Sequence, residues 1–441
     1  MTEERSGVYA EKLSKMIQKE TISTPGGDLD VTKFREFHGL LKELFPKLAK
    51  EALWEDFDGA LLIHIKRPGS LRAPFIFMNH HDVVEANGIW KHEPFSGDIA
   101  EGKVWGRGTL DTKGGLFAML QAAEELLESG AKFNRDIYFV SSCNEETTGK
   151  GAKKISETLK ERKVFAEITF DEGGMVVDEP LTGVKGTFAM VSLGEKGCCD
   201  IRFAARSKGG HSSSPRKNEA LVRLGRFMAD ADRKVIFKRE ISPVLDGMFR
   251  ALAPHIKGLS FVLGHPGLFS GLLKLAAPYI SPLIQAMMQT TLCFTMAEGS
   301  NGTNVLPTEA AVIGNMRCSH HEGMEESLKK LIPFAKKYNV EIDVVDPAIK
   351  TRLMAPDGKA FKLVEKAVKE AVPAADKSIP YIVTGTTDAR YFDDISEETI
   401  RFLPLRVKLE QIDSIHGRNE CVDIESLAPA VDFYKYLMQN G

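Results

Sequence analysis

Three short apolar stretches constrain the fold of this chain most strongly. Each one leads into histidines or carboxylates, which are residue types that can bind a metal ion or transfer a proton. Residues 73–78, 136–143 and 166–170 have the length and the β-favouring content of buried strands. Segments with helical spacing, such as 116–127, alternate with strands along the chain. This alternation predicts an α/β fold with a mixed, mostly parallel sheet covered by helices. The residues that follow the three stretches are His80, His81, Asp82, Glu145, Glu146, Asp171 and Glu172.

The ends of these strands are where a site is expected, because open α/β sheets bind ligands outside the carboxyl ends of their strands. Zinc binds histidine nitrogen and carboxylate oxygen. Two zinc ions that lie close together also need a carboxylate that bridges them. Such a site needs one histidine and one carboxylate for each ion and one carboxylate that bridges both. The chain can supply all of these ligands. The candidate ligands are His80, Asp111 in a Gly-rich turn, Glu146, Asp171 and the late His416.

Two carboxylates beside these ligands have other roles in this interpretation. Glu145 is a spare carboxylate next to a ligand and is suited to act as a general base. Asp82 lies two residues after His80, so both point to the same side of an extended segment and Asp82 can orient the imidazole. His81 faces away and is not expected to bind metal. Each motif alone also fits a solvated loop or helix. A further histidine pair, His320-His321, is interpreted as a solvated helix start rather than as a metal site.

Length and composition limit the class of protein. A chain of 441 residues is expected to form two or three domains. A net charge of -3 gives no electrostatic reason to expect nucleic acid as a partner. The six cysteines form no CxxC pair, and the first twenty residues are charged rather than apolar. These features predict a cytoplasmic protein with reduced thiols and no signal peptide.

A change of pattern near residue 196 predicts a domain boundary. We expect one discontinuous domain, formed by residues 1–195 and 347–441, with a second domain inserted at 196–346. The inserted domain contains an apolar insertion at about 237–295, and residues 275–297 carry no charge. A membrane span is not expected, because prolines and glutamines interrupt a run that is barely long enough. The interrupting residues are Pro278, Pro282, Gln285 and Gln289.

Several motifs together resemble those of a known family. In chain order they read HHDVVEANGIWKHEPFSG, GKVWGRGTLDTKGG, NEETTGKGA, DEGG, SKGGHSSSP, TNVLP, GTTDAR and IHGRNE. Their order and spacing resemble those of the zinc-dependent aminoacylase/carboxypeptidase group, which includes acetylornithine deacetylase, succinyl-diaminopimelate desuccinylase, carboxypeptidase G and aminoacylase. The resemblance covers nearly the whole chain. It implies a dizinc exopeptidase-like catalytic domain and an inserted ferredoxin-like α+β lid.

The resemblance also implies a role for each matching residue. His80 and Asp171 would bind one zinc, Glu146 and His416 the other, and Asp111 would bridge both. Glu145 would be the base, Asp82 the orienting residue, and His211 of the lid would stabilise the oxyanion. Asn304, Arg317, Arg390 and the backbone at Gly385 would hold the substrate. Either Asp171 or Glu172 can be the ligand, and Asp171 is favoured because it directly follows the strand. Co²⁺ or Mn²⁺ can substitute for zinc in such sites.

The sequence therefore predicts a metallohydrolase that cleaves the amide bond of a peptide or an N-acyl amino acid with a free carboxylate. The alternatives are a non-catalytic zinc-binding protein on the same fold and a dizinc hydrolase of another substrate class, such as a phosphoesterase. Segments such as PLIQAMMQTTLCFTMAEGSNGTNVLP, at 282–307, resemble the subgroup of carboxypeptidase S and the N-fatty-acyl-amino-acid hydrolases. Residues 237–295 look like an insertion relative to the smaller enzymes. This insertion is expected to pack helices against the lid, or else to line an apolar pocket or replace a dimer contact. The sequence is compatible with a monomer and with a homodimer.

Overall fold

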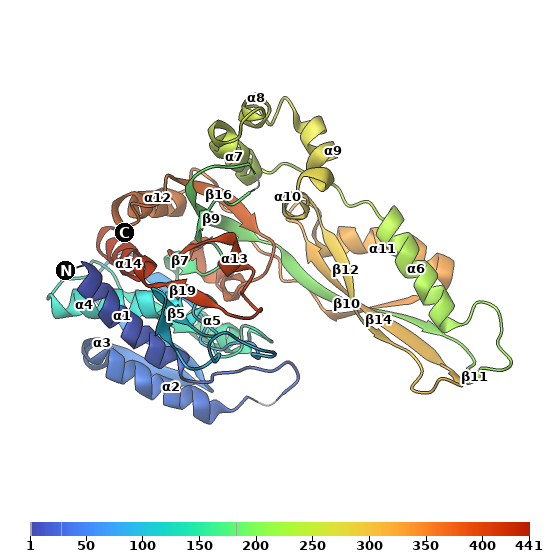
Figure 1. Cartoon of the computed structure of the whole chain (residues 1–441), viewed down its shortest axis with the longest axis horizontal. Coiled ribbons are helices and arrows are strands. Elements are labelled where there is room, and N and C mark those ends of the chain that lie inside the picture. Colours follow the sequence, from blue (N-terminus) through green and yellow to red (C-terminus); the bar gives the residue numbers. More distant parts are fainter. Residues whose placement is uncertain (1, 28, 182) are drawn as a thin grey trace.

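The computed structural model describes residues 2–27, 29–181 and 183–441. Two large sheets, each with its own helices, lie one after the other along the long axis of the molecule (Figure 1). The N-terminus and the C-terminus both lie on the part that contains the larger sheet, and the middle of the chain forms the other part.

The larger sheet has ten strands and a parallel centre. Its path runs through β1 (Leu53–Phe57), β2 (Ala60–Ile65), β6 (Ile137–Ser141), β3 (Phe75–Met78), β7 (Ala166–Asp171), β17 (Ser396–Arg401), β9 (Thr187–Glu195), β8 (Val176–Asp178) and β18 (Arg406–Val407), with β16 (Lys377–Val383) paired to β9. β3 runs parallel to both β6 and β7, and β17 runs parallel to β7. β1 and β2 are antiparallel additions at one edge. The expectation of a mixed, mostly parallel sheet is confirmed.

Helices cover both faces of this sheet, because its central strands are buried on both sides. In β6, Ile137 and Phe139 enter one apolar cluster, whereas Tyr138 and Val140 enter another, as the alternation of a strand requires. α1, α4, α12 and α14 contribute to the first cluster, and α5 contributes to the second. The helices of this part are α1 (Thr2–Ile17), α2 (Val31–Leu44), α3 (Pro46–Glu51), α4 (Lys113–Glu128), α5 (Lys150–Glu161), α12 (Lys359–Ala371), α13 (Leu409–Ile412) and α14 (Leu427–Asn440).

The second large sheet has four antiparallel strands and forms the lid. Its order is β12 (Thr291–Glu298), β14 (Glu309–Cys318), β10 (Gly197–Arg206) and β15 (Glu341–Asp346). α6 (Ala220–Lys234) and α11 (Gly323–Tyr338) pack on this sheet and share a separate apolar cluster with it. The chain enters the lid between β9 and β10 and leaves it after β15. A two-stranded ribbon, β11 (Gly210–His211) with β13 (Val305–Leu306), lies at the far tip of the lid (Figure 1).

The 237–295 insertion folds into short helices, and these pack differently from the expectation. They are α7 (Pro243–Leu252), η1 (Ala253–His255), α8 (Ser260–Gly264), α9 (Ser270–Ile280) and α10 (Pro282–Met288). α7 and α10 each begin with Ser-Pro, whose serine accepts a backbone hydrogen bond as the N-cap. Their buried side chains belong to the core of the ten-stranded sheet, and α7 contacts β16. The expectation that the insertion packs helices against the lid is therefore wrong for these helices, because their apolar faces join the core of the larger sheet, whereas residues 291–295 belong to β12 of the lid.

A third, three-stranded sheet and several single turns connect these parts. The sheet consists of β4 (Ile99–Ala100), β5 (Lys103–Trp105) and β19 (Cys421–Asp423), and the 3-10 turns are η2 (Asp388–Tyr391), η3 (Asp393–Ile395) and η4 (Ile424–Ser426). Across the described residues, no helix has both the length and the apolar character needed to cross a bilayer.

Candidate active site

Three parallel strands end at the same edge of the ten-stranded sheet, and each ends beside a candidate ligand. β3 leads to His80, β6 leads to Glu145 and Glu146, and β7 ends in Asp171. In the part of the chain that the structure describes, one group of three metal-binding side chains meets with its ligand atoms within 4.8 Å of one another. Its members are His80, Asp111 and Glu146. The site therefore lies where the topology of the sheet predicts it.

His80 is held between two aspartates. Its Nε2 lies 2.9 Å from Oδ1 of Asp111, and its Nδ1 lies 2.9 Å from the carbonyl oxygen of Asp82. The Asp82 carboxylate also lies 3.4 Å from Nδ1 and accepts hydrogen bonds from the backbone nitrogens of Glu145 and Glu146. Asp82 thus fixes both the imidazole and the turn that carries the two glutamates. Burial opposes the imidazolium most strongly, but the two aspartates outweigh it and raise the pKa of His80.

His416 reaches the same group from a distant part of the chain. Its Nε2 lies 2.9 Å from Oε2 of Glu146 and 3.2 Å from Oδ2 of Asp111. Hydrogen bonds to Asp111 and Glu146 raise the pKa of His416 to about 10. Asp111 therefore touches a histidine through each of its oxygens, which is the arrangement that a bridging carboxylate needs.

A buried carboxylate, Glu420, joins the two loops that carry Asp111 and His416. Its Oε1 accepts hydrogen bonds from the backbone nitrogens of Leu110 and Asp111, and its Oε2 binds Nη1 of Arg107 at 2.7 Å. The pairing of β19 with β5 brings these loops together. Sequence reasoning missed this residue, although it ends the motif IHGRNE, because nothing local shows that its partners lie more than three hundred residues away.

The acidic groups of the site are crowded in a buried environment. Burial is the largest cause that raises the pKa of Glu145, Glu146 and Glu172 above the ordinary value for a carboxyl. Neighbouring negative charges raise each of them further. Several buried carboxylates with two histidines are a donor set that suits divalent zinc, because the cation neutralises the charge that otherwise opposes burial. The residues present therefore fit a metal site.

Asp171 and Glu172 occupy different environments. Oδ1 of Asp171 accepts a hydrogen bond from the backbone nitrogen of Glu172 at 2.9 Å, and Oδ2 accepts one from the backbone nitrogen of Ala389 at 2.7 Å. Glu172 instead interacts electrostatically with Asp111, His80 and Glu146. Both oxygens of Asp171 are thus engaged by the backbone, whereas the pKa of Glu172 responds to the charges of three of the candidate ligands.

A cavity of about 660 Å³ opens beside these residues, at the junction with the lid. Glu145, Glu146 and His416 line it on one side. Three of the predicted substrate-binding residues line it as well, namely Arg317 from β14, Gly385 and Arg390. Arg317 donates from Nη1 to Oγ1 of Thr386 at 3.4 Å, so a lid side chain contacts the loop that contains Gly385.

Two predicted residues lie elsewhere. His211 is in β11 at the tip of the lid (Figure 1), where its side chain is exposed and its Nδ1 lies 2.8 Å from Oγ of Ser213. Asn304 is next to it, since its carbonyl oxygen accepts a hydrogen bond from the backbone nitrogen of Ser212. Neither is among the described residues that line the cavity. The structure therefore does not bring these two residues to the metal-binding group.

The loop that contains Gly385 is anchored by a carboxylate that sequence reasoning also missed. Oε2 of Glu195 accepts hydrogen bonds from the backbone nitrogen and from Oγ1 of Thr387, and it lies 3.1 Å from Nε of Arg401. The side chains of Glu195 and Arg401 are completely buried. Glu195 is the last residue of β9, so the anchor lies where the chain passes from the larger sheet into the lid.

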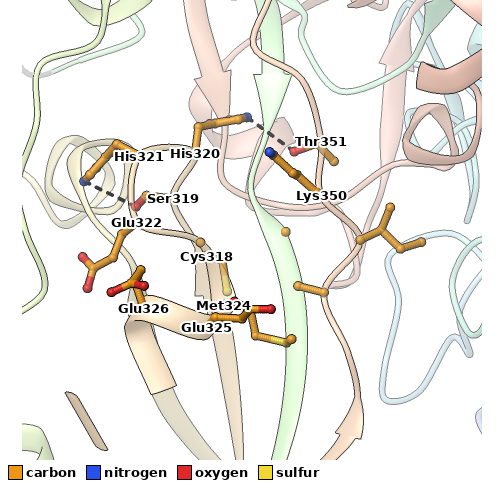
Figure 2. A pocket seen from close by; sticks show the side chains of 14 residues that line it. Cys318, Ser319, His320, His321, Glu322, Met324, Glu325, Glu326, Lys350 and Thr351 are labelled. Carbon is orange, nitrogen blue, oxygen red and sulfur yellow. Dashed lines mark hydrogen bonds between the residues drawn. The ribbon is translucent and has the colours of Figure 1, made fainter. Parts of the chain in front are cut away.

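His320 and His321 line a second cavity, of about 420 Å³, between the lid and the segment that returns from it (Figure 2). Burial lowers the pKa of His320 to about 4, and its Nε2 lies 3.4 Å from Oγ1 of Thr351. His321 Nε2 lies 2.7 Å from the carbonyl oxygen of Lys238. The expected helix does start here, since α11 begins at Gly323. His320 is not fully solvated as expected, because the returning segment partly covers it. Within the described residues, neither histidine belongs to a group of metal-binding side chains.

Comparisons with known proteins agree with this geometry. The model of Peptidase family M20/M25/M40 matches residues 76–440. The chain is 28% identical over 448 residues to the N-fatty-acyl-amino acid synthase/hydrolase PM20D1 of Xenopus tropicalis, covering 100% of this chain and 87% of the relative. It is 26% identical over 487 residues to carboxypeptidase S of Saccharomyces cerevisiae, covering 97% and 83%. The M20 family metallo-carboxypeptidase Sso-CP2 from Sulfolobus solfataricus matches the fold with a TM-score of 0.72 at 16% identity, over 98% of both chains.

The sheet-end ligands, the cavity and the lid define a hydrolytic metalloenzyme, a metallopeptidase or amidohydrolase. More specifically, the chain belongs to Peptidase family M20/M25/M40. The family resemblance that the sequence motifs indicate is thereby confirmed.

Proposed function

We propose that this protein is a dizinc hydrolase that cleaves the amide bond of a peptide or an N-acyl amino acid with a free carboxylate. The observation that carries the proposal is the meeting of His80, Asp111 and Glu146 beside Glu145, at a cavity that two arginines also line. Two of the matched relatives are named for carboxypeptidase activity and for N-fatty-acyl-amino acid hydrolysis. Both names describe a substrate that has an amide bond near a carboxylate.

Five side chains would hold the metals. His80 and Glu172 would bind one zinc, Glu146 and His416 would bind the other, and Asp111 would lie between them. We assign Glu172 rather than Asp171, because both oxygens of Asp171 already accept backbone hydrogen bonds. When bound, the zinc pair would polarise the amide carbonyl and make water acidic enough to lose a proton near neutral pH.

Glu145 would move the proton. Its backbone nitrogen donates to Asp82, which also holds His80, so the main chain at Glu145 is held beside this ligand. The Glu145 carboxylate would accept a proton from the attacking water and deliver it to the nitrogen of the leaving amine. Because Glu145 lines the cavity together with Arg390, a substrate bound there lies within reach of the base.

Arg317 and Arg390 would hold the carboxylate of the substrate, with the backbone at Gly385. An arginine offers two parallel N–H donors to a carboxylate, which fixes orientation as well as charge. Arg317 comes from the lid and Arg390 from η2. Binding of the substrate would therefore hold the lid and the larger sheet together.

His211 would stabilise the oxyanion only after a change of position or with a partner subunit. Its place at the tip of the lid leaves two routes, which are closure of the lid over its own site and insertion into the site of a second copy. An imidazole that donates to the developing oxyanion acts in the transition state rather than on the bound substrate.

A substrate screen tests the proposal. Zinc-loaded wild-type enzyme would be assayed against dipeptides, N-acetyl and N-fatty-acyl amino acids, the same compounds with an amidated carboxyl group, and phosphodiesters. We expect hydrolysis of an amide with a free carboxylate and little turnover of its amidated partner. The matched control is Glu145→Gln. Hydrolysis of phosphodiesters alone, or amide hydrolysis that Glu145→Gln leaves unchanged, would contradict the proposal.

A further inference from the structure

The outer side of the insertion collects exposed apolar side chains. Eight of the 24 large apolar side chains that are exposed in the described structure lie between residues 259 and 283. We call this surface the α8–α9 face, and it includes Leu259, Phe261, Leu268, Leu272, Leu275 and Tyr279. Tyr279 is 88% exposed and Leu275 is 68% exposed. Single exposed apolar residues are ordinary, whereas a concentration of this kind indicates an interaction surface.

α9 is apolar around most of its circumference, and Lys274 is its one charged residue. Leu273 and Ala277 are buried against the core, while Leu272, Leu275 and Tyr279 point outward. A surface helix ordinarily has polar residues on the side opposite its buried stripe, whereas the outer side of α9 carries leucines and a tyrosine. α8 and α9 nevertheless lie at one margin of the molecule, away from the lid sheet (Figure 1). The outer side of α9 is therefore suited to an apolar environment that the single chain does not provide.

A cavity of about 420 Å³ reaches into the insertion beneath this face. Two of its lining residues, Leu259 and Ile280, are exposed, whereas Leu263, Leu273 and Ile284 are buried. Among the described residues that line it, Ser281 has the one polar side chain and none is charged. A hydrocarbon chain could enter such a cavity, whereas a polar peptide would leave its backbone groups without hydrogen-bond partners.

The charges of the insertion favour a lipid surface over a second copy of the chain. Residues 251–297 contain no aspartate or glutamate, although the whole chain has 61, and they contain Lys257 and Lys274. Lys257 is exposed and Lys274 is half-buried. A carboxylate that interacts with Lys274 belongs to Glu240, which lies outside this segment and whose pKa Lys274 helps to lower. A symmetric dimer through this face would place the same lysines opposite each other without carboxylates from the segment. Anionic lipid phosphates would supply the missing charge.

We propose that the α8–α9 face docks on the surface of a lipid bilayer. Its leucines and aromatic rings would enter the boundary between headgroups and acyl chains, and Lys257 and Lys274 would lie against lipid phosphates. α9 has 11 residues, which is too short to span a bilayer, so the helix would lie in the interface. This proposal rests on the exposed face, the cavity beneath it and the charges of the segment, and it is independent of the proposed function.

Flotation with vesicles tests the proposal. Full-length protein would be mixed with phosphatidylcholine vesicles, with and without phosphatidylglycerol, and separated on a density gradient. The matched variants are Leu272→Gln/Leu275→Gln on the α8–α9 face and Leu71→Gln, a fully exposed leucine elsewhere. Glutamine keeps helix propensity and adds no charge. We expect wild type and Leu71→Gln to float with anionic vesicles, and the double variant to partition at least about tenfold less.

Two further measurements distinguish lipid binding from dimerisation and from unfolding. Lys257→Gln/Lys274→Gln is expected to reduce flotation with anionic vesicles and to leave weak binding to neutral vesicles. Failure of the wild type to float with either vesicle overturns the proposal. It is also overturned if wild type is a dimer in solution that Leu272→Gln/Leu275→Gln converts to a monomer, because a second copy would then cover the face. An unchanged melting midpoint for each variant shows that the loss does not come from unfolding.

Discussion

Glu195 accepts two hydrogen bonds from Thr387, one from its backbone nitrogen at 2.6 Å and one from its hydroxyl at 2.8 Å. The same carboxylate oxygen pairs with the buried Arg401. This contact links the point where the chain enters the lid to the loop that precedes Arg390. It therefore couples the position of the lid to the wall of the cavity.

Glu195→Gln is expected to weaken both stability and substrate binding. The variant removes the carboxylate that pairs with the buried Arg401, and breaking such a pair typically costs about 3–5 kcal/mol in the free energy of unfolding. It also loosens the loop at Gly385, so KM should rise more than kcat falls. Denaturant unfolding and steady-state kinetics measure the two effects. The control is Glu397→Gln, an exposed glutamate on β17, and equal KM values for wild type and Glu195→Gln would contradict the positioning role.

Glu145→Gln is expected to lower kcat by about 10²–10⁴-fold, because a general base is lost while the shape is kept. Its zinc content should match that of wild type, since Glu145 is not assigned as a ligand. Elemental analysis and turnover would be measured on the same samples. Loss of zinc in this variant would make Glu145 a ligand, and wild-type turnover would remove it from the mechanism.

Substitutions of Asp171 and Glu172 are expected to have different effects on zinc content and on stability. Glu172→Gln should reduce zinc content and activity together. Asp171→Asn should keep more zinc but lower the melting midpoint, because the hydrogen bonds to Glu172 and Ala389 weaken by about 1–3 kcal/mol each when a charged acceptor is lost. Elemental analysis and thermal unfolding distinguish the pair. If Asp171→Asn loses zinc and Glu172→Gln retains it, the assignment of the ligand is reversed.

His211→Ala is expected to lower kcat and kcat/KM together by about 10²–10³-fold, as the loss of one oxyanion donor does. A mixture of His211→Ala with Glu145→Gln shows how the histidine reaches the site. Restored activity means that a partner subunit supplies it, whereas no restoration with a monomeric mass in solution means that the lid closes within one chain. Wild-type activity of His211→Ala alone would remove the residue from catalysis.

Stability is expected to rise with pH above 7 because of Lys196. Burial lowers the pKa of its amine to about 7 from an ordinary 10.5, and the amine donates to the carbonyl oxygen of Gln289 at 2.9 Å. Between these values the unfolded chain binds more protons than the folded one, so the free energy of unfolding increases with pH, by at most about 1.4 kcal/mol per unit. Below pH 7 both states are protonated and the slope vanishes.

Denaturant unfolding from pH 7 to 10 measures this slope. Lys196→Met should reduce it, whereas the exposed Lys350→Met should leave it unchanged. Lys113 has a similarly lowered pKa of about 7, caused by burial, and its parallel contribution should remain in the variant. An identical slope in wild type and Lys196→Met would show that Lys196 does not titrate in this range.

The sequence by itself determined the class of the fold and the family. Strands such as 136–143 and helices such as 116–127 are specified by hydrophobic periodicity, which is a local property. The position of His80 and Glu146 at strand ends could also be predicted, because parallel strands place their carboxyl ends at one edge. Helix and strand ends shifted by a few residues, as between the expected strand at 136–143 and the observed β6 (Ile137–Ser141).

Only the tertiary structure decided which side chains complete the site. Asp171 and Glu172 are adjacent in sequence, and their roles depend on the backbone nitrogen of Ala389, which lies 218 residues from Asp171. The partners of Glu420 and Glu195 are equally distant, so no local pattern indicates them. The packing of the insertion beside β16 and the place of His211 at the lid tip also depend on how separate elements meet. Apolar faces identify what must be buried, but the surface that buries them is chosen only when the whole chain folds.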